Sequence, residues 1–155
     1  MENLQIRKIT GNDVVQLQQI CIQTFAETFS AMNSEEDMQK YLADSFSDEK
    51  LRTELRDENS AYYFALVNEK VAGYLKVNSG QSQNELKNEN ALEIERIYVL
   101  KAFQGKRVGQ GLFEKAIEIA LQKEVDFVWL GVWEHNAKAI RFYRKNGFEV
   151  FDRHV

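Results

Sequence analysis

Apolar residues recur at three- and four-residue intervals in three stretches of the chain, as they do in a helix that buries one face. These stretches predict helices over residues 13–29, 109–122 and 136–145. Two shorter helices are predicted by serines that can cap a first turn: Ser34 before a run of acids, and Ser47 before Asp48-Glu49.

Other stretches are dense in β-branched and aromatic residues or alternate apolar with polar ones, which is the pattern of strands. Asn68-Glu69-Lys70 predicts the tight turn of a hairpin. The polar segment from Asn78 to Asn90 predicts an exposed loop. The predicted strands cover residues 4–9, 61–67, 71–77, 91–100, 126–132 and 148–151.

Together these elements follow the order β-α-α-α-β-β-β-α-β-α-β. This order predicts an α/β (α+β) fold, with a mixed, mostly antiparallel central sheet and helices on both faces. The chain has 155 residues, which suits one domain, and residues 1–155 show no repeat or linker.

Composition narrows the choice of function. The net charge of −4 argues against nucleic-acid binding and suits a cationic substrate. Cys21 is the only cysteine, so no internal disulfide is expected, and its place on an apolar helix face predicts a buried residue rather than a nucleophile. We see neither a signal-peptide pattern nor a membrane-spanning stretch, and we expect a cytoplasmic protein. His135 and His154 form no metal-ligand pattern, so no metal site is expected.

A glycine-bearing segment, Gln104-Gly105-Lys106-Arg107-Val108-Gly109-Gln110-Gly111, lies between a predicted strand and a predicted helix. Glycines let the backbone turn tightly and expose N–H groups, and a helix N-terminus attracts anions, so this segment can hold a phosphate. It matches neither the Walker pattern nor the dinucleotide fingerprint. Taken alone, it is equally a loop that only begins a helix.

With residues 92–100 before it, this segment resembles motif A of the GNAT acetyltransferases, written Q/R-x-x-G-x-G/A. The downstream run from Asn136 to Phe148 resembles their motif B, N-x-x-A-x-x-F-Y-x-x-x-G-F. The wording Leu-Glu-Ile-Glu-Arg-Ile-Tyr-Val and Trp-Leu-Gly-Val-Trp-Glu is most similar to the PaiA-type polyamine N-acetyltransferases. The resemblance spans nearly the whole chain and is weakest between residues 43 and 60.

The resemblance implies that acetyl-CoA lies between two splayed strands. Backbone groups of Ile97, Tyr98 and Val99 would pair with its pantetheine arm, Asn136 would hydrogen-bond that arm, and Val99 N–H would bind the oxyanion. Its pyrophosphate would rest on the amides of Gln104, Gly105, Lys106, Arg107, Val108, Gly109 and Gln110.

Tyr143 matches the tyrosine that protonates the departing thiolate, and Glu93 or Glu95 would take the amine's proton directly or through water. Each has a plainer interpretation: Tyr143 as a core tyrosine, Asn136 as a helix cap, and Glu93 and Glu95 as a solvated strand face.

Two features depart from the family pattern. Arg107 stands where motif A usually has glycine. The chain also stops at Val155, before a strand that this family usually has, so the final strand is expected to be absent through truncation or supplied by a partner in a homodimer.

The resemblance favours a polyamine, such as spermidine or spermine, as the acetyl acceptor. In this family the first two helices form the acceptor wall, where the acids Glu27, Glu35, Glu36 and Asp37 and the aromatic residues Phe25, Phe29 and Tyr41 fall. A protein N-terminus or lysine remains an alternative acceptor, and a non-catalytic acyl-CoA-binding regulatory domain an alternative function. A nucleic-acid-binding regulator agrees least with the sequence.

Overall fold

The structure is a computed structural model that describes residues 3–29, 34–131 and 137–148. Its elements follow the predicted order as far as the last helix. They are β1 (Leu4–Lys8), α1 (Val14–Phe29), α2 (Glu35–Ser45), α3 (Asp48–Arg56), β2 (Ser60–Val67), β3 (Lys70–Ser79), β4 (Ala91–Val99), α4 (Val108–Gln122), β5 (Phe127–Leu130) and α5 (Ala137–Lys145). The predicted strand 148–151 falls almost wholly outside the described residues.

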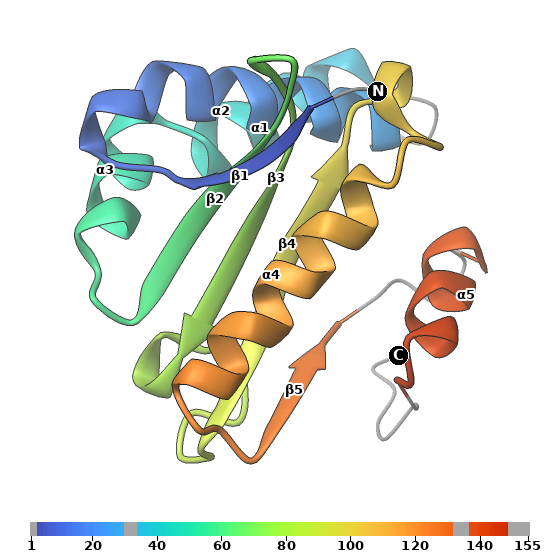
Figure 1. Cartoon of the computed structure of the whole chain (residues 1–155). Helices are drawn as coiled ribbons and strands as arrows, with labels where there is room; N and C mark the ends of the chain where they lie inside the picture. The colour runs from blue at the N-terminus through green and yellow to red at the C-terminus, as the bar shows by residue number, and fades with distance from the viewer. Residues whose placement is uncertain (1–2, 30–33, 132–136, 149–155) are drawn as a thin grey trace.

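The strands form a five-stranded sheet in the order β1-β2-β3-β4-β5. The first four pair antiparallel, whereas β4 and β5 are parallel and joined by the α4 crossover. Pairing between β4 and β5 ends at Ile94 and Leu130, although β4 continues to Val99. β5 ends at this point, so the rest of β4 has no strand partner on that side within the described residues (Figure 1). The mixed, mostly antiparallel sheet that the pattern predicted is confirmed.

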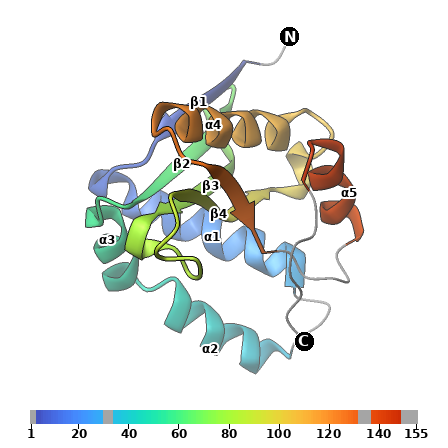
Figure 2. The ribbon, with the colours of Figure 1, turned by 90° about the horizontal axis from the view of Figure 1, so that it is seen from below.

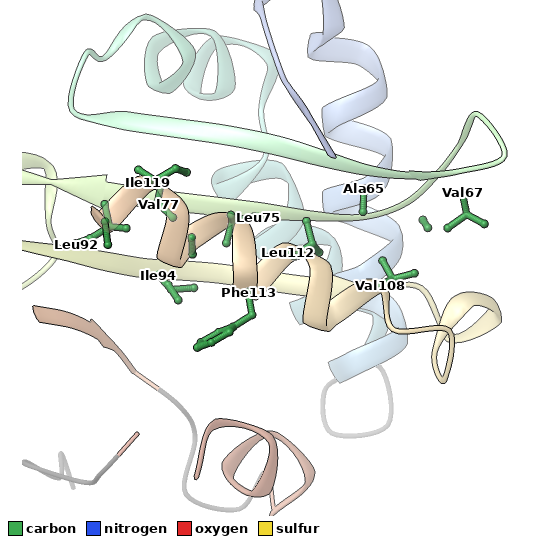
Figure 3. Packing of buried hydrophobic residues seen from close by; sticks show 13 residues of the cluster. Ala65, Val67, Leu75, Val77, Leu92, Ile94, Val108, Leu112, Phe113 and Ile119 are labelled. Carbon is green, nitrogen blue, oxygen red and sulfur yellow. The ribbon is translucent and has the colours of Figure 1, made fainter. Parts of the chain in front are cut away.

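Helices cover both faces of the sheet, with α4 on one side and α1 and α3 on the other (Figure 2). The face under α4 is apolar, and Figure 3 shows Val108, Leu112 and Ile119 packed over the strands. The strand residues that they cover include Ala65, Val67, Leu75, Val77, Leu92 and Ile94. The face under α1 and α3 holds Leu17, Ile20, Cys21, Phe46, Leu51, Tyr62, Phe64 and Tyr74. Two cores thus share one sheet, and Cys21 is buried as expected.

Local sequence signals set the ends of several elements. Ser34 Oγ accepts a hydrogen bond from Asp37 N–H at 3.1 Å, and Ser47 Oγ accepts one from Lys50 N–H at 3.2 Å, which confirms both predicted caps. Gly147 follows α5 at φ +92°, in the left-handed region where a helix often ends.

The prediction of an exposed loop from Asn78 to Asn90 is wrong in part. β3 continues through Asn78, which is fully buried and faces Glu93 on β4. Gln83 is also buried, because its amide donates to the carbonyls of Gly80, Leu86 and Glu89 and accepts a hydrogen bond from Trp129 Nε1. Polar side chains can be buried when all their hydrogen bonds are made, and polarity alone does not reveal this.

Within the described residues no helix is long and apolar enough to cross a membrane.

Candidate active site

The C-terminal half of β4, from Glu95 to Val99, has no strand partner on its β5 side within the described residues. This open edge is called the gap below. Leu100 N–H donates to Ala72 O on the β3 side at 2.9 Å. Because hydrogen-bonding direction alternates along an antiparallel strand, the backbone groups of Tyr98 also point toward β3, and those of Ile97 and Val99 point away from it. Ile97 therefore offers its N–H and C=O groups to a ligand on this open edge, and Val99 offers its N–H, while Val99 O accepts a hydrogen bond from Gln104 Nε2 at 3.2 Å. The backbone of Tyr98, predicted to do the same, faces β3.

Glycine at position 73 lets β3 lie close to this part of β4. A Cβ atom placed there would lie 2.4 Å from Tyr98 O, a distance that real Cβ atoms essentially never show. The contacting atom is backbone and cannot move aside without moving β4.

The glycine-bearing loop from Gln104 to Gln110 ends at the N-terminus of α4. Gly105 and Arg107 both have positive φ, at +83° and +64°. Gly111 N–H donates to Arg107 O at 3.1 Å, so the N–H groups of the first three helical residues have no carbonyl partner inside the helix. Such groups, with the helix dipole, form a site for an anion.

Arg107 replaces the expected glycine at a position where glycine is conformationally favoured. The left-handed conformation costs a non-glycine residue about 1–2 kcal/mol. Its side chain is exposed, so the guanidinium group is available to solvent or to an anion.

Tyr143 lies on α5 and is partly buried among aromatic rings. Its ring centroid is 5.4 Å from that of Phe142 and 5.8 Å from that of Phe148. Burial, followed by the nearby phenol of Tyr98, raises the pKa of Tyr143 well above its usual range, so the hydroxyl keeps its proton at neutral pH. Asn136 lies outside the described residues.

Two contacts attach α5 to α4. Gln110 Nε2 donates to Asn146 Oδ1 at 3.2 Å. Phe113 packs against Phe142 with ring centroids 5.9 Å apart. The helix with the candidate acid is thus tied to the helix that begins at the candidate phosphate loop.

Glu95 forms a β-bulge in β4. Lys76 faces Arg96 and Val77 faces Ile94, which leaves Glu95 as an extra residue. Its carboxylate accepts hydrogen bonds from Lys76 Nζ at 2.9 Å, Asn78 Nδ2 at 2.7 Å and Asn84 Nδ2 at 3.0 Å. Burial alone would raise the pKa of Glu95, but the charges of Lys76 and Arg96 and these hydrogen bonds lower it to about 2.

Glu93 is buried, with 4% of its surface exposed. Its carboxylate accepts from Asn78 Nδ2 at 3.0 Å and from the backbone and side-chain nitrogens of Asn84, both at 2.9 Å. The interpretation of Glu93 and Glu95 as a solvated strand face is therefore wrong. Both belong to a buried polar cluster that also contains Glu54, Lys76, Asn78 and Arg96.

Sequence reasoning did not single out Lys76 or Asn78. They lie two residues apart on β3, and they point to the same face of the sheet as the buried Tyr74. Polar residues at alternate positions of a strand between two others are a usable signal for a buried polar cluster.

On the acceptor side, Phe25 of α1 and Tyr41 of α2 stack with centroids 4.5 Å apart and planes 12° from parallel. Tyr41 is 47% exposed, so part of this aromatic pair is in contact with solvent. Burial raises the pKa of Tyr98, the positive charge of Arg96 opposes this effect, and the phenol of Tyr41 adds to it.

The four predicted acceptor acids differ in their surroundings. Glu27 Oε1 accepts a hydrogen bond from Lys101 N–H at 2.8 Å and so joins α1 to the segment after β4. Glu35, Glu36 and Asp37 are exposed in the first turn of α2, where acids also stabilise the helix through its dipole.

Among the described residues no cluster of His, Cys, Asp and Glu could hold a metal ion.

Comparison with known proteins identifies the family. The Acetyltransferase (GNAT) family model matches residues 21–148. An uncharacterized N-acetyltransferase of Lactobacillus delbrueckii subsp. lactis is 41% identical over the whole chain and 90% of its own length. The chain belongs to the GNAT acetyltransferase family.

More distant similarities agree with this family. A spermidine N(1)-acetyltransferase of Thermoplasma acidophilum is 26% identical, over 97% of this chain and 91% of that protein. The crystal structure of the PaiA N-acetyltransferase from Thermoplasma acidophilum, in complex with coenzyme A, superposes with a TM-score of 0.86 at 24% identity, covering 98% and 93% of the two chains. An aminoglycoside acetyltransferase from a soil metagenome has a TM-score of 0.77 at 19% identity, covering 99% and 96%.

As a GNAT family member, the protein is an acetyl-CoA-dependent N-acetyltransferase. The placement of acetyl-CoA against Ile97, Val99 and the glycine-bearing loop stays a prediction from the motifs.

Proposed function

We propose that this GNAT enzyme transfers the acetyl group of acetyl-CoA to a primary amine of a polyamine such as spermidine or spermine. The observation that carries this substrate class is the full-length similarity to a spermidine N(1)-acetyltransferase. The open aromatic pair Phe25–Tyr41 supports it, because an ammonium group is attracted to an aromatic face. The net charge of −4 also favours a cationic acceptor.

The chain holds acetyl-CoA through backbone groups. Ile97 and Val99 pair with the pantetheine arm along the open edge of β4, and Asn136 contributes a side-chain hydrogen bond in the way the motif implies. The amides from Gly105 to Gln110 receive the pyrophosphate at the N-terminus of α4. Gln104 N–H, which was predicted to take part, instead donates to Lys101 O at 3.2 Å. The exposed Arg107 adds a positive charge beside them.

Val99 N–H and Tyr143 act on the reacting atoms. As the amine attacks the thioester carbonyl, Val99 N–H donates to the carbonyl oxygen, which gains negative charge. Tyr143 then gives its proton to the departing thiolate, a step that typically contributes about 10²–10⁴-fold to the rate. Tyr143 holds its proton at neutral pH, as any phenol does, although its raised pKa makes it a weaker acid.

The acceptor arrives as an ammonium ion and must lose a proton before it attacks. Glu93 is enclosed by Asn78 and Asn84, whereas the Glu95 side chain retains 19% exposure. We therefore assign the proton-accepting carboxylate to Glu95, acting through water. Its low pKa keeps it ionised and able to attract the ammonium group, although it makes Glu95 a weak base.

Thiol release from acetyl-CoA tests this function directly. The protein is assayed with spermidine, spermine, a simple monoamine and a lysine peptide. Tyr143→Phe is compared with Tyr63→Phe, which removes a half-buried phenol beside Lys115 of α4, at a residue that belongs to neither motif. We expect the highest kcat/KM with the polyamines, a fall of about 10²-fold or more in Tyr143→Phe and little change in Tyr63→Phe.

Preference for the lysine peptide would overturn the polyamine assignment while leaving acetyl transfer intact. Equal activity of the two phenylalanine variants would remove Tyr143 as the acid. Binding of acetyl-CoA without release to any amine would indicate a regulatory domain instead.

A further inference from the structure

Lys138 lies in the first turn of α5, and its side chain reaches the start of the cofactor loop. Lys138 Nζ donates to Gln104 Oε1 at 3.1 Å. Gln104 Nε2 in turn donates to Val99 O at 3.2 Å. One continuous set of contacts therefore joins α5, the cofactor loop and the open edge of β4.

The partner of Lys138 in this contact is a neutral amide oxygen. A phosphate oxygen carries a full negative charge, and hydrogen bonds between two charged groups are shorter and about twice as strong as neutral ones. The Lys138 side chain is exposed and flexible, so its ammonium group can leave Gln104 and bind a phosphate of a ligand seated on the loop.

We propose that Lys138 is a cofactor-binding residue that contacts a phosphate group of acetyl-CoA from α5, opposite the amides of the Gln104–Gln110 loop. This inference rests on the proposed cofactor site and adds a residue that neither motif A nor the predicted site contained. The phosphate is either the pyrophosphate or the 3′-phosphate, and the two share the same chemistry toward an ammonium group.

The contact also links cofactor binding to the placement of Tyr143. Lys138 and Tyr143 lie on the same short helix, which is further held by Gln110 at Asn146 and by Phe113 at Phe142. A phosphate bound at Lys138 adds a third attachment, at the N-terminal end of α5.

Calorimetric titration with CoA tests the proposal without an acceptor amine. Lys138→Gln is compared with Lys138→Arg and with Lys145→Gln, an exposed lysine seven residues further along α5 and hence about 10 Å away along its axis. We expect Lys138→Gln to weaken CoA binding by about fivefold or more, Lys138→Arg to recover most of the affinity and Lys145→Gln to change it less than about twofold. High salt should reduce the difference between Lys138→Gln and the unaltered protein.

The same titrations with dephospho-CoA, which lacks the 3′-phosphate, locate the contact. Loss of the Lys138→Gln effect with this ligand assigns Lys138 to the 3′-phosphate, and its persistence assigns Lys138 to the pyrophosphate. Equal affinities of Lys138→Gln and Lys145→Gln for CoA would overturn the role of Lys138 alone. Failure of the unaltered protein to bind CoA would instead overturn the cofactor site as a whole.

Discussion

The two faces of β3 and β4 are built from the same strands but differ in kind. Toward α4 they present Leu75, Val77, Leu92 and Ile94, which pack with the apolar side of that helix. Toward α1 and α3 they present Lys76, Asn78, Glu93 and Arg96, with Glu95 in the bulge between them. One face is an ordinary apolar core, and the other encloses charged groups.

The polar cluster on the second face calls for an explanation other than stability. Burying ion pairs is often no better for stability than packing apolar residues of similar size, so the polar cluster has no clear purpose as a stabiliser. It lies on the face that also holds Tyr98 and Phe25, and its Glu95 is the bulge residue directly after Ile94, the last residue of β4 that pairs with β5. Apolar packing on both faces contributes stability, whereas the polar cluster lies on the same face as Phe25 and Tyr98.

Removing one charge from the polar cluster should have the largest effect. Lys76→Met leaves the carboxylates of Glu54 and Glu95 without their ammonium partner, at 3.3 and 2.9 Å in the structure. We expect the free energy of unfolding to fall by about 3–5 kcal/mol, measured by urea denaturation at pH 7. Lys123→Met, at an exposed position, should change it by less than about 0.5 kcal/mol. A similar small change in both variants would show that the cluster is not electrostatically coupled.

The acid dependence of stability should differ between the two faces. The pKa of Glu95 is about 2 when folded and near 4.5 when unfolded, so its contribution is present above pH 4.5 and is lost as the pH falls toward 2. We expect a loss of about 3 kcal/mol over this range that is absent in Glu95→Gln.

Leu112→Ala, on the α4 face, provides the matched comparison. It should cost about 2–5 kcal/mol at every pH, because no ionisable group is involved. Parallel pH profiles for the unaltered protein and Glu95→Gln would contradict the low pKa of Glu95.

The smallest expected effect is at the cofactor loop. Arg107→Gly removes the strain of a non-glycine residue in the left-handed conformation. Glycine also increases the conformational entropy of the unfolded chain, which offsets most of this gain. We therefore expect the free energy of unfolding to rise by up to about 1 kcal/mol. Lys123→Gly, at φ −85°, has no such strain to relieve and should lower stability by about 0.5–1 kcal/mol. A loss in Arg107→Gly equal to that in Lys123→Gly would show that the conformation at Arg107 is not strained. Thermal unfolding followed by circular dichroism measures both.

Much of the fold could be predicted because it depends on local patterns. The periodicity in α1 and α4, the serine caps of α2 and α3 and the turn at residues 68–70 all lie within short windows of sequence. The alternation of Lys76 and Asn78 on β3 was a usable signal, but the partner of Asn78, Glu93 on β4, could not be predicted from it. The burial of Gln83 could not be predicted, because its partner Trp129 lies on β5.

The candidate site divides in the same way. The sequence by itself determined the phosphate-type loop, the order of the two motifs and the family, because residue types and spacings within continuous segments carry those features. Only the tertiary structure decided that the backbones of Ile97 and Val99, rather than Tyr98, point away from β3, that Glu93 is buried and Glu95 partly buried, and that Lys138 reaches Gln104. These facts depend on strand register, a bulge and the packing of a distant helix, which are set by contacts between segments far apart in the chain.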